Sequence, residues 1–310
     1  MISKALARGQ DNGLTQKAAL ASLFAGALAL ALAPILVKLS SLGPITTAWY
    51  RLMIALPFFL PGYWRNLFLV QPGADTATSQ ASYSTRDWLL MVLAGLFFAV
   101  DLAIFNLSLG LTQVATATLF NNLAPIFVIF FSWFLFGERI SAGIILSLIM
   151  TLGGMVLFLG NGFSFRADQT FGDGLAILTA IFYAAYLVTI KSLRSRHFTS
   201  TIMVITSATG AAILLPIMLF EGTPPWPRTL EGWTILIALG IVCHVMGRGL
   251  VTVAMSKLTV TFISFGLLLQ PVAAACFAQA LFGETLSLTQ IVGGFLVLLG
   301  IGLARSRYRA

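Results

Sequence analysis

The stretch Leu-Phe-Gly-Glu at residues 135–138 recurs at residues 281–284, near the end of a chain of 310 residues. A shift of about 146 residues that superimposes the two copies also brings Pro125 onto Pro271. The same shift aligns five further identical pairs: Val114 with Val260, Phe131 with Phe277, Ser141 with Ser287, Ile145 with Ile291, and Gly154 with Gly300. We therefore predict that the chain consists of two duplicated halves.

The composition predicts a protein that lies in a bilayer. Hydrophobic residues make up 58% of the chain and charged residues only 9%, whereas a soluble domain carries about a quarter charged residues. About ten apolar runs are long enough to cross a hydrocarbon core of about 30 Å. These runs cover 18–38, 43–62, 88–108, 113–134, 141–160, 172–191, 199–220, 232–254, 259–281 and 287–305. We expect an all-α integral membrane fold of ten transmembrane helices, because helices satisfy their own backbone hydrogen bonds in lipid.

Five runs fall in each half, and this sets the expected domain boundaries. We expect a cytoplasmic N-terminal segment at 1–17, a first five-helix repeat at 18–160, a second at 161–305, and a cytoplasmic tail at 306–310. Because each repeat holds an odd number of helices, the second must enter the membrane in the opposite orientation, so the repeats are inverted. The first run is full-length and is followed at once by others, which favours a retained helix over a signal peptide.

The net charge of +8 is explained by membrane topology rather than by nucleic acid binding. With ten helices, one side of the membrane receives most basic residues: Lys4, Arg8, Lys17, Arg65, Arg86, Arg139, Lys191, Arg194, Arg196, Lys257, Arg305, Arg307 and Arg309. The other side receives only Lys38, Arg166 and Arg228. Basic residues concentrate on the cytoplasmic side, so we expect both termini there, in a multi-pass protein of the bacterial inner membrane.

Pro125 and Pro271 occupy matching positions about halfway along their helices. A proline leaves the carbonyl four residues earlier without its donor, which frees the carbonyls of Asn121 and Leu267. Broken backbone survives at membrane depth only where it faces protein or a wet cavity. Either proline alone is as readily a packing kink, but their symmetry favours a shared central site at which the helices change conformation.

Four polar residues fall at similar depth in the predicted outer half of the membrane: Asp101, Arg51, Asn121 and Asn122. Polar side chains inside a bilayer are expensive, so each is a candidate for lining a substrate cavity. Two interpretations of Asp101 remain open. It either pairs with Arg51 and fixes two helices together, or contacts a substrate or a proton.

Three further polar residues, His244, Gln270 and Tyr183, lie near mid-span and would converge at one depth. His244 could titrate near neutral pH or could be a hydrogen-bonded core residue. Phe105 stands one turn from Asp101 on the same helix face. Trp49 lines the cavity or sits at the outer interface.

Several other residues are more readily explained without a bound ligand. Cys243 and Cys276 lie inside predicted helices, where a thiol usually serves as a small apolar residue. Arg248 is close enough to the cytoplasmic end of its helix for its side chain to reach water. The glycine pairs at 153–154 and 293–294 favour close helix contact rather than phosphate binding.

These features carry a family resemblance. The first helix ends Ala-Pro-Ile-Leu-Val-Lys at 33–38, the second contains Trp-Tyr-Arg at 49–51, and Pro125 and Pro271 each precede a Phe-Gly-Glu. Together with the duplicated five-helix pattern, they resemble the drug/metabolite transporter superfamily, EamA type. Similarity to its aromatic amino acid exporters implies a basket-like central cavity lined by both halves, while the substrates of members differ widely.

The sequence favours transport over catalysis. It contains no paired-histidine zinc motif, no GxSxG elbow and no GxxxxGK[ST] loop, so we expect no enzyme activity, cofactor or metal site. We expect a secondary-active transporter that exports a small organic metabolite such as an amino acid by alternating access. The alternatives are proton-coupled import or export of another metabolite, and a lipid-translocating or structural membrane protein. The oligomeric state is left open.

Overall fold

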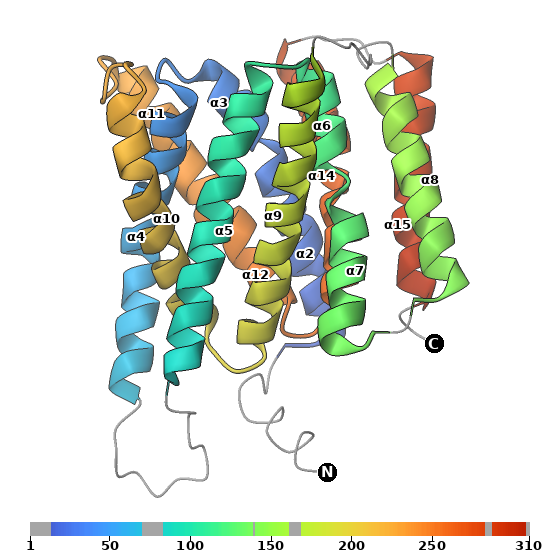
Figure 1. The fold of residues 1–310 in the computed structure, drawn as a ribbon, viewed down its shortest axis with the longest axis horizontal. Coiled ribbons are helices and arrows are strands. Elements are labelled where there is room, and N and C mark those ends of the chain that lie inside the picture. Colours follow the sequence, from blue (N-terminus) through green and yellow to red (C-terminus); the bar gives the residue numbers. More distant parts are fainter. Residues whose placement is uncertain (1–13, 70–82, 139, 161–168, 283–286, 308–310) are drawn as a thin grey trace, which may run out of the picture.

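The computed structural model describes residues 14–69, 83–138, 140–160, 169–282 and 287–307, and Figure 1 shows their arrangement. Every regular element within these ranges is a helix. The first half contains α2 (Gln16–Ala31), α3 (Ala33–Leu39), α4 (Pro44–Leu69), α5 (Thr85–Leu109), α6 (Val114–Asn121), α7 (Ala124–Phe136) and α8 (Ala142–Leu159). The second contains α9 (Thr170–Arg194), α10 (Thr199–Phe220), α11 (Leu230–Ala238), η3 (Leu239–Arg248), α12 (Gly249–Ala254), α13 (Val260–Leu267), α14 (Leu269–Phe282) and α15 (Leu288–Arg307).

The helices confirm the expectation of an all-α integral membrane protein. Within the described ranges, nine helical stretches are long and apolar enough to cross a membrane, and they overlap nine of the ten predicted runs. The remaining run, 43–62, lies in α4, a helix of 26 residues. Large apolar side chains cover the outer surface, among them Phe134 and Phe220, which are 73% and 90% exposed. Such a surface is suited to contact with lipid rather than with water.

Three of the membrane-crossing stretches are interrupted next to a proline. Pro34 follows the break between α2 and α3, Pro125 follows the break between α6 and α7, and Pro271 is the third residue of α14. Proline cannot donate a backbone hydrogen bond but is tolerated in the first turn of a helix, so each proline begins a new helical segment. The predicted interruptions at Pro125 and Pro271 are therefore present, and the break at Pro34 was not predicted.

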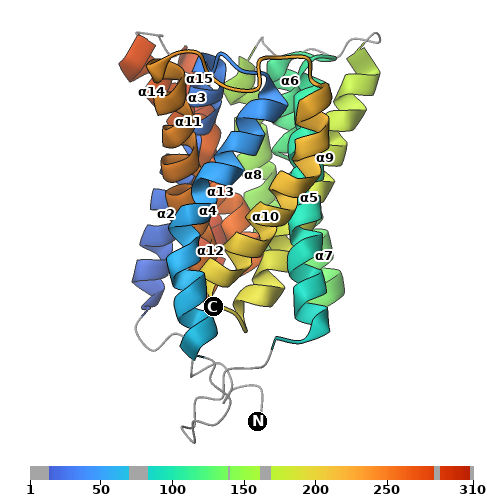
Figure 2. The ribbon, with the colours of Figure 1, turned by 90° about the vertical axis from the view of Figure 1, so that its left-hand side faces the viewer.

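The helices form a bundle in which elements from the two halves alternate. α5 packs along α9 and α10, and α4 packs along α10 and η3; Figure 2 shows α4 and α10 side by side. α2 packs against η3, α12 and α14. The first turn of α2 and the last turn of α15 lie on the same side of the bundle, the lower side in Figure 1, which we call the terminal side.

The fifth helices of the two halves, α8 and α15, pair at one edge of the bundle (Figure 1). Their backbones approach so closely that a Cβ atom on Gly293 would lie only 2.6 Å from the carbonyl oxygen of Gly154. Small residues permit such contacts between helices in a membrane. The predicted packing role is confirmed for these two glycines, whereas Gly153 has open space where its side chain would be.

Candidate functional site

A group of charged and aromatic side chains lies buried in the middle of the bundle, and we call it the central cluster. It contains Arg51 from α4, Phe98 and Asp101 from α5, Tyr183 and Tyr186 from α9, and His244 and Arg248 from η3. The three charged side chains are each less than 10% exposed. Two of the contributing helices come from each half of the chain, so the cluster sits where the halves meet.

Arg248 is held by three aromatic rings. Its guanidinium carbon lies 4.5 Å from the ring centre of Phe98, 5.0 Å from that of Tyr183 and 5.4 Å from that of Tyr186. Its Nη1 atom donates a hydrogen bond to the Tyr183 hydroxyl at 3.2 Å. Cation–π contacts are stronger when water is excluded, as here. The expectation that Arg248 reaches water is wrong, because these rings offer the guanidinium partners inside the protein.

Arg51 and Asp101 do not form the direct ion pair that equal depth permitted. Among the described residues, no hydrogen bond or ion pair involves either side chain, and the Arg51 Nε atom is buried without a partner. The Asp101 carboxylate nevertheless lies within electrostatic reach of both guanidinium groups. The structure thus gathers three charges without neutralising them pairwise.

His244 is the most deeply buried polar residue of the cluster, at 1% exposure. Its Nε2 atom lies 3.0 Å from the Ser207 hydroxyl of α10, while its Nδ1 atom has no partner among the described residues. The imidazole lies between the rings of Phe59 and Phe98, at 6.4 and 5.9 Å between centres. Of the two predicted interpretations, the contacts match a hydrogen-bonded core histidine.

η3 is a π-helix of ten residues within the eighth predicted run. Compared with an α-helix, each extra residue in a turn rotates the side chains that follow by about 100° around the axis. Close contact with α2 accompanies this widening, since a Cβ atom on Gly26 would lie 2.8 Å from the Gly247 carbonyl oxygen. π-Helical turns occur frequently at functional sites, and this one carries both His244 and Arg248.

Asn121 and Asn122 lie at the break between α6 and α7. The Asn121 Oδ1 atom accepts a hydrogen bond from the Thr179 hydroxyl at 3.1 Å, and Thr179 is one turn from Tyr183 on α9. The Asn122 Nδ2 atom instead donates to the Thr118 carbonyl at 2.8 Å. Asn121 therefore faces α9 one turn away from the central cluster, while the Asn122 side chain hydrogen-bonds to a backbone carbonyl at the end of α6.

The other predicted site residues have apolar or aromatic neighbours, or no hydrogen bond to a described residue. Phe105 packs in a small apolar group formed by α5, α6 and α9, and Trp49 packs edge-on against Tyr50 with 5.0 Å between ring centres. Gln270 is half-buried beside Pro271 at the start of α14, with no side-chain hydrogen bond to a described residue. Sequence reasoning missed Phe98, although it stands one turn before Asp101.

At the end of the bundle opposite the terminal side, Glu221, which follows α10, contacts the start of α4. Its carboxylate accepts hydrogen bonds from the backbone nitrogens of Ile45 and Thr46 at 2.8 and 2.9 Å, and from the Thr46 hydroxyl at 2.6 Å. Free backbone N–H groups and the helix dipole make an N-terminus a favourable place for a carboxylate. Glu221 therefore caps α4 and ties the second half to the first.

A second contact between the halves lies on the terminal side. Asp87, in the first turn of α5, lies 3.1 Å from the Arg196 guanidinium and 3.2 Å from His197 Nε2. The His197 ring stacks on Tyr83 with 4.9 Å between centres. Burial lowers the pKa of His197 below its ordinary value of 6.5, and the neighbouring Asp87 opposes this shift without cancelling it. Each end of the bundle is thus fastened by a carboxylate.

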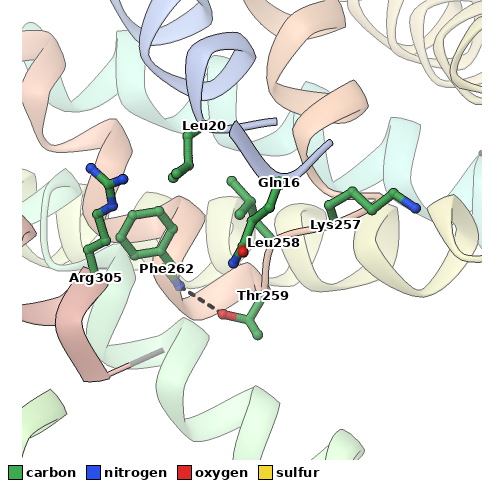
Figure 3. Close-up of a pocket in the computed structure, with 7 residues that line it drawn as sticks. All are labelled: Gln16, Leu20, Lys257, Leu258, Thr259, Phe262 and Arg305. Atoms are coloured by element: carbon green, nitrogen blue, oxygen red, sulfur yellow. Dashed lines mark hydrogen bonds between the residues drawn. The ribbon is translucent and has the colours of Figure 1, made fainter. Parts of the chain in front are cut away.

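A separate, small cavity of about 80 Å³ opens on the terminal side between α2, α13 and α15. Figure 3 shows Gln16, Leu20 and Phe262 at this cavity, with the basic side chains of Lys257 and Arg305 on either side. None of the seven residues that line it belongs to the central cluster. Among the described residues, no group of three or more His, Cys, Asp or Glu side chains could hold a metal ion.

Comparison with known proteins agrees with this architecture. The EamA-like transporter family model matches the chain twice, at residues 17–160 and 170–306. A solved crystal structure superimposes with a TM-score of 0.78 at 20% sequence identity, covering 95% of this chain and 99% of the other, which shows the same fold.

Three curated proteins illustrate the sequence similarity. An uncharacterized transporter of Archaeoglobus fulgidus is 32% identical over 66% of this chain and 75% of its own length. The pseudopaline exporter CntI of Pseudomonas aeruginosa is 26% identical over 70% of this chain and 75% of its own. The aromatic amino acid exporter YddG of Ancylobacter novellus is 33% identical over 43% and 47%. The chain is a multi-pass membrane protein that belongs to the EamA-like transporter family.

Proposed function

We propose that the protein is a secondary-active transporter that exports small organic metabolites, such as amino acids, by alternating access. The observation that carries this proposal is the central cluster, in which Arg51, Asp101 and Arg248 are buried and form no direct ion pair with any described residue. A buried charge without a partner is costly for a purely structural protein, and in membrane proteins such residues mark substrate or ion pathways. The exporter names of two relatives, CntI and YddG, support the same class.

Alternating access requires two halves that can move against each other around a fixed site. We propose that α4 also crosses the membrane, which gives ten transmembrane helices arranged as inverted repeats at 18–160 and 161–305. The two family matches and the shift of about 146 residues support the duplication. Movement would separate Glu221 from α4 at one end, or Asp87 from His197 at the other.

The helix breaks beside Pro125 and Pro271 are suited to this movement. Each separates two short helices, α6 from α7 and α13 from α14, whose ends lack part of the continuous hydrogen-bond ladder. Hinges absorb conformational change at a few residues at element ends. We propose that these two breaks let the fourth helix of each half bend as the cluster opens.

Purified protein in liposomes provides the test of transport. We expect counterflow of a labelled amino acid into vesicles that are preloaded with the same unlabelled solute, with and without an imposed pH gradient. Glu231→Gln, a change at an exposed residue, is the matched control for Asp101→Asn, and should retain transport that Asp101→Asn loses. Uptake equal to that of protein-free vesicles for a full panel of amino acids and related metabolites would contradict the proposal.

We further propose that the terminal side faces the cytoplasm, because the predicted loops on that side carry most of the basic residues. Cysteine labelling in intact cells tests this orientation after the exposed Cys276 has been replaced by Ala. A membrane-impermeant maleimide should modify a thiol at Ala167, which lies outside the described residues, but not one at the exposed Ser306 of α15. The reverse labelling pattern would refute the orientation.

A further inference from the structure

The charges in the central cluster do not balance. Arg51 and Arg248 each contribute one positive charge, and Asp101 is the acidic member of the cluster. With Asp101 ionised, one positive charge is left without a countercharge; with Asp101 protonated, two are left. A buried guanidinium has its proton in either case, since arginine is effectively always charged. The cluster in the middle of the bundle is therefore positively charged before any ligand binds.

Arg248 has a defined edge left over for a ligand. Aromatic rings occupy the face of its guanidinium, and Tyr183 takes a hydrogen bond from Nη1. The Nε atom on the other edge is buried and has no partner among the described residues. A guanidinium offers its donors as a planar fork that matches the two oxygens of a carboxylate. The free edge of Arg248 thus has the shape of a carboxylate-binding group.

Arg51 supplies a second guanidinium that could bind a carboxylate, and Asp101 supplies a carboxylate that could bind an amine. The Arg51 Nε atom is likewise buried without a partner, and no described residue pairs with the Asp101 carboxylate. An ammonium group is the natural partner of a lone buried carboxylate. The ring of Phe98, one turn from Asp101 on α5, and the ring of Tyr186 stack with 5.0 Å between centres and supply an apolar wall beside these charges.

We propose that the central cluster binds amino acids that carry two carboxylates for each amine, with the carboxylates on Arg51 and Arg248 and the amine on Asp101. This inference rests on the proposed transport function and names the substrate class of the same site. A neutral amino acid would satisfy only one of the two arginines, and a simple amine would satisfy neither. The aminodicarboxylate alone neutralises all three charges.

Four ligands of similar size separate these contributions. L-glutamate has an amine and two carboxylates, L-glutamine replaces one carboxylate by an amide, glutarate lacks the amine, and 4-aminobutyrate lacks one carboxylate. Binding to the purified protein in nanodiscs is measured by calorimetry. We expect L-glutamate to bind at least about tenfold more tightly than each of the other three, because hydrogen bonds to charged groups discriminate by this amount or more.

Variants assign each charge to its partner. One of the two changes Arg248→Gln and Arg51→Gln, the one that removes the partner of the side-chain carboxylate, should abolish the preference for glutamate over glutamine. The other should weaken glutamate and glutamine alike and abolish the preference for glutamate over 4-aminobutyrate, while Asp101→Asn should abolish the preference for glutamate over glutarate. Arg305→Gln, at an exposed residue beside the small cavity of Figure 3, is the control and should leave these preferences unchanged. A preference ratio is measured within one folded variant, so a general loss of stability does not imitate the expected result.

The outcomes distinguish this inference from the proposed function. Equal binding of glutamate and glutamine, or failure of glutamate to bind, overturns the inference even if neutral amino acids are transported. Selective binding of glutamate that depends on Arg248 supports the inference about the substrate class, whether or not flux is found in liposomes. Absence of flux refutes only the proposed transport function. Selective binding that persists unchanged in Arg248→Gln and Arg51→Gln also overturns the assignment.

Discussion

The shift that aligns the two halves pairs α5 with the segment formed by α11, η3 and α12, and these two regions differ at the central cluster, whereas the proline-broken helices that follow them are alike. α5 is an uninterrupted helix of 25 residues that carries Asp101. Its counterpart is divided into α11, η3 and α12 and carries Arg248. The shift of about 146 residues places Asp101 on Gly247, next to Arg248. Asp101 of the first half and Arg248 of the second half thus carry opposite charges at nearly the same position.

The fourth helices show the opposite behaviour. Both are broken beside a proline, between α6 and α7 in the first half and between α13 and α14 in the second. The fifth helices, α8 and α15, also keep matching glycines at 154 and 300. The comparison indicates that the positions which shape the scaffold stayed symmetric after duplication. The positions that we propose to contact a solute differ, because one asymmetric ligand cannot satisfy two identical half-sites.

The largest expected effect comes from removing the charge of Asp101, which distinguishes the first half from the second. Asp101→Asn should lower transport by at least about thirtyfold, equivalent to about 2 kcal/mol, because the amide cannot pair with a cation as a carboxylate does. The melting temperature in detergent should stay close to that of the parent protein, since the carboxylate has no described partner to abandon. Glu231→Gln, on an exposed residue of α11, makes the same chemical change away from the cluster.

A stability loss would point to the structural role instead. If Asp101 in fact neutralised Arg51, its removal would leave a buried charge and cost about 3 to 5 kcal/mol. The double variant Asp101→Asn with Arg51→Gln would then recover the melting temperature. Recovery of stability in the double variant would refute the assignment of Asp101 to the substrate.

The second effect tests the symmetric scaffold. Gly293→Ala should destabilise the protein by about 1 to 3 kcal/mol, because its Cβ would lie 2.6 Å from the Gly154 carbonyl oxygen and force α8 and α15 apart. Gly302→Ala, on the same helix but with open space around it, is the control and should be neutral or slightly stabilising. The ratio of transport rates for two solutes should be unchanged in both variants. A change in this ratio would show that the scaffold helices also set specificity.

The third effect concerns the two matched breaks. Pro125→Ala and Pro271→Ala each restore a backbone donor and allow a continuous helix, so transport per folded molecule should fall severalfold while yield changes little. Pro216→Ala is the control, because Pro216 lies inside the unbroken helix α10. Transport rates are compared after normalisation to monodisperse protein on size-exclusion chromatography. Equal rates in all three variants would leave the prolines as packing features.

The sequence predicts the scaffold of this protein better than its site. Hydropathy locates the helices, because every crossing of a bilayer needs a long apolar run, and Pro125 and Pro271 mark the interruptions because proline lacks a donor. Depth along a helix placed Arg51 and Asp101 at one level, but it does not fix the direction in which each side chain points. Arg248 was misjudged for a related reason: a π-helical turn leaves no trace in apolar periodicity, and it changes which way the residues after it face.

The smallest expected effect is a pH dependence at the terminal-side contact, where the two halves are fastened by Asp87 and His197. Because burial lowers the pKa of His197 in the folded protein, the unfolded chain binds its proton more readily. Stability from this residue is therefore complete above the ordinary pKa of 6.5 and declines as the pH falls below it. His197→Gln should flatten the fall in melting temperature between about pH 7.5 and pH 5.5, whereas Arg305→Gln should not. A steeper fall in the His197 variant would show that the ion pair with Asp87 outweighs burial, since protonation would then stabilise the fastened end.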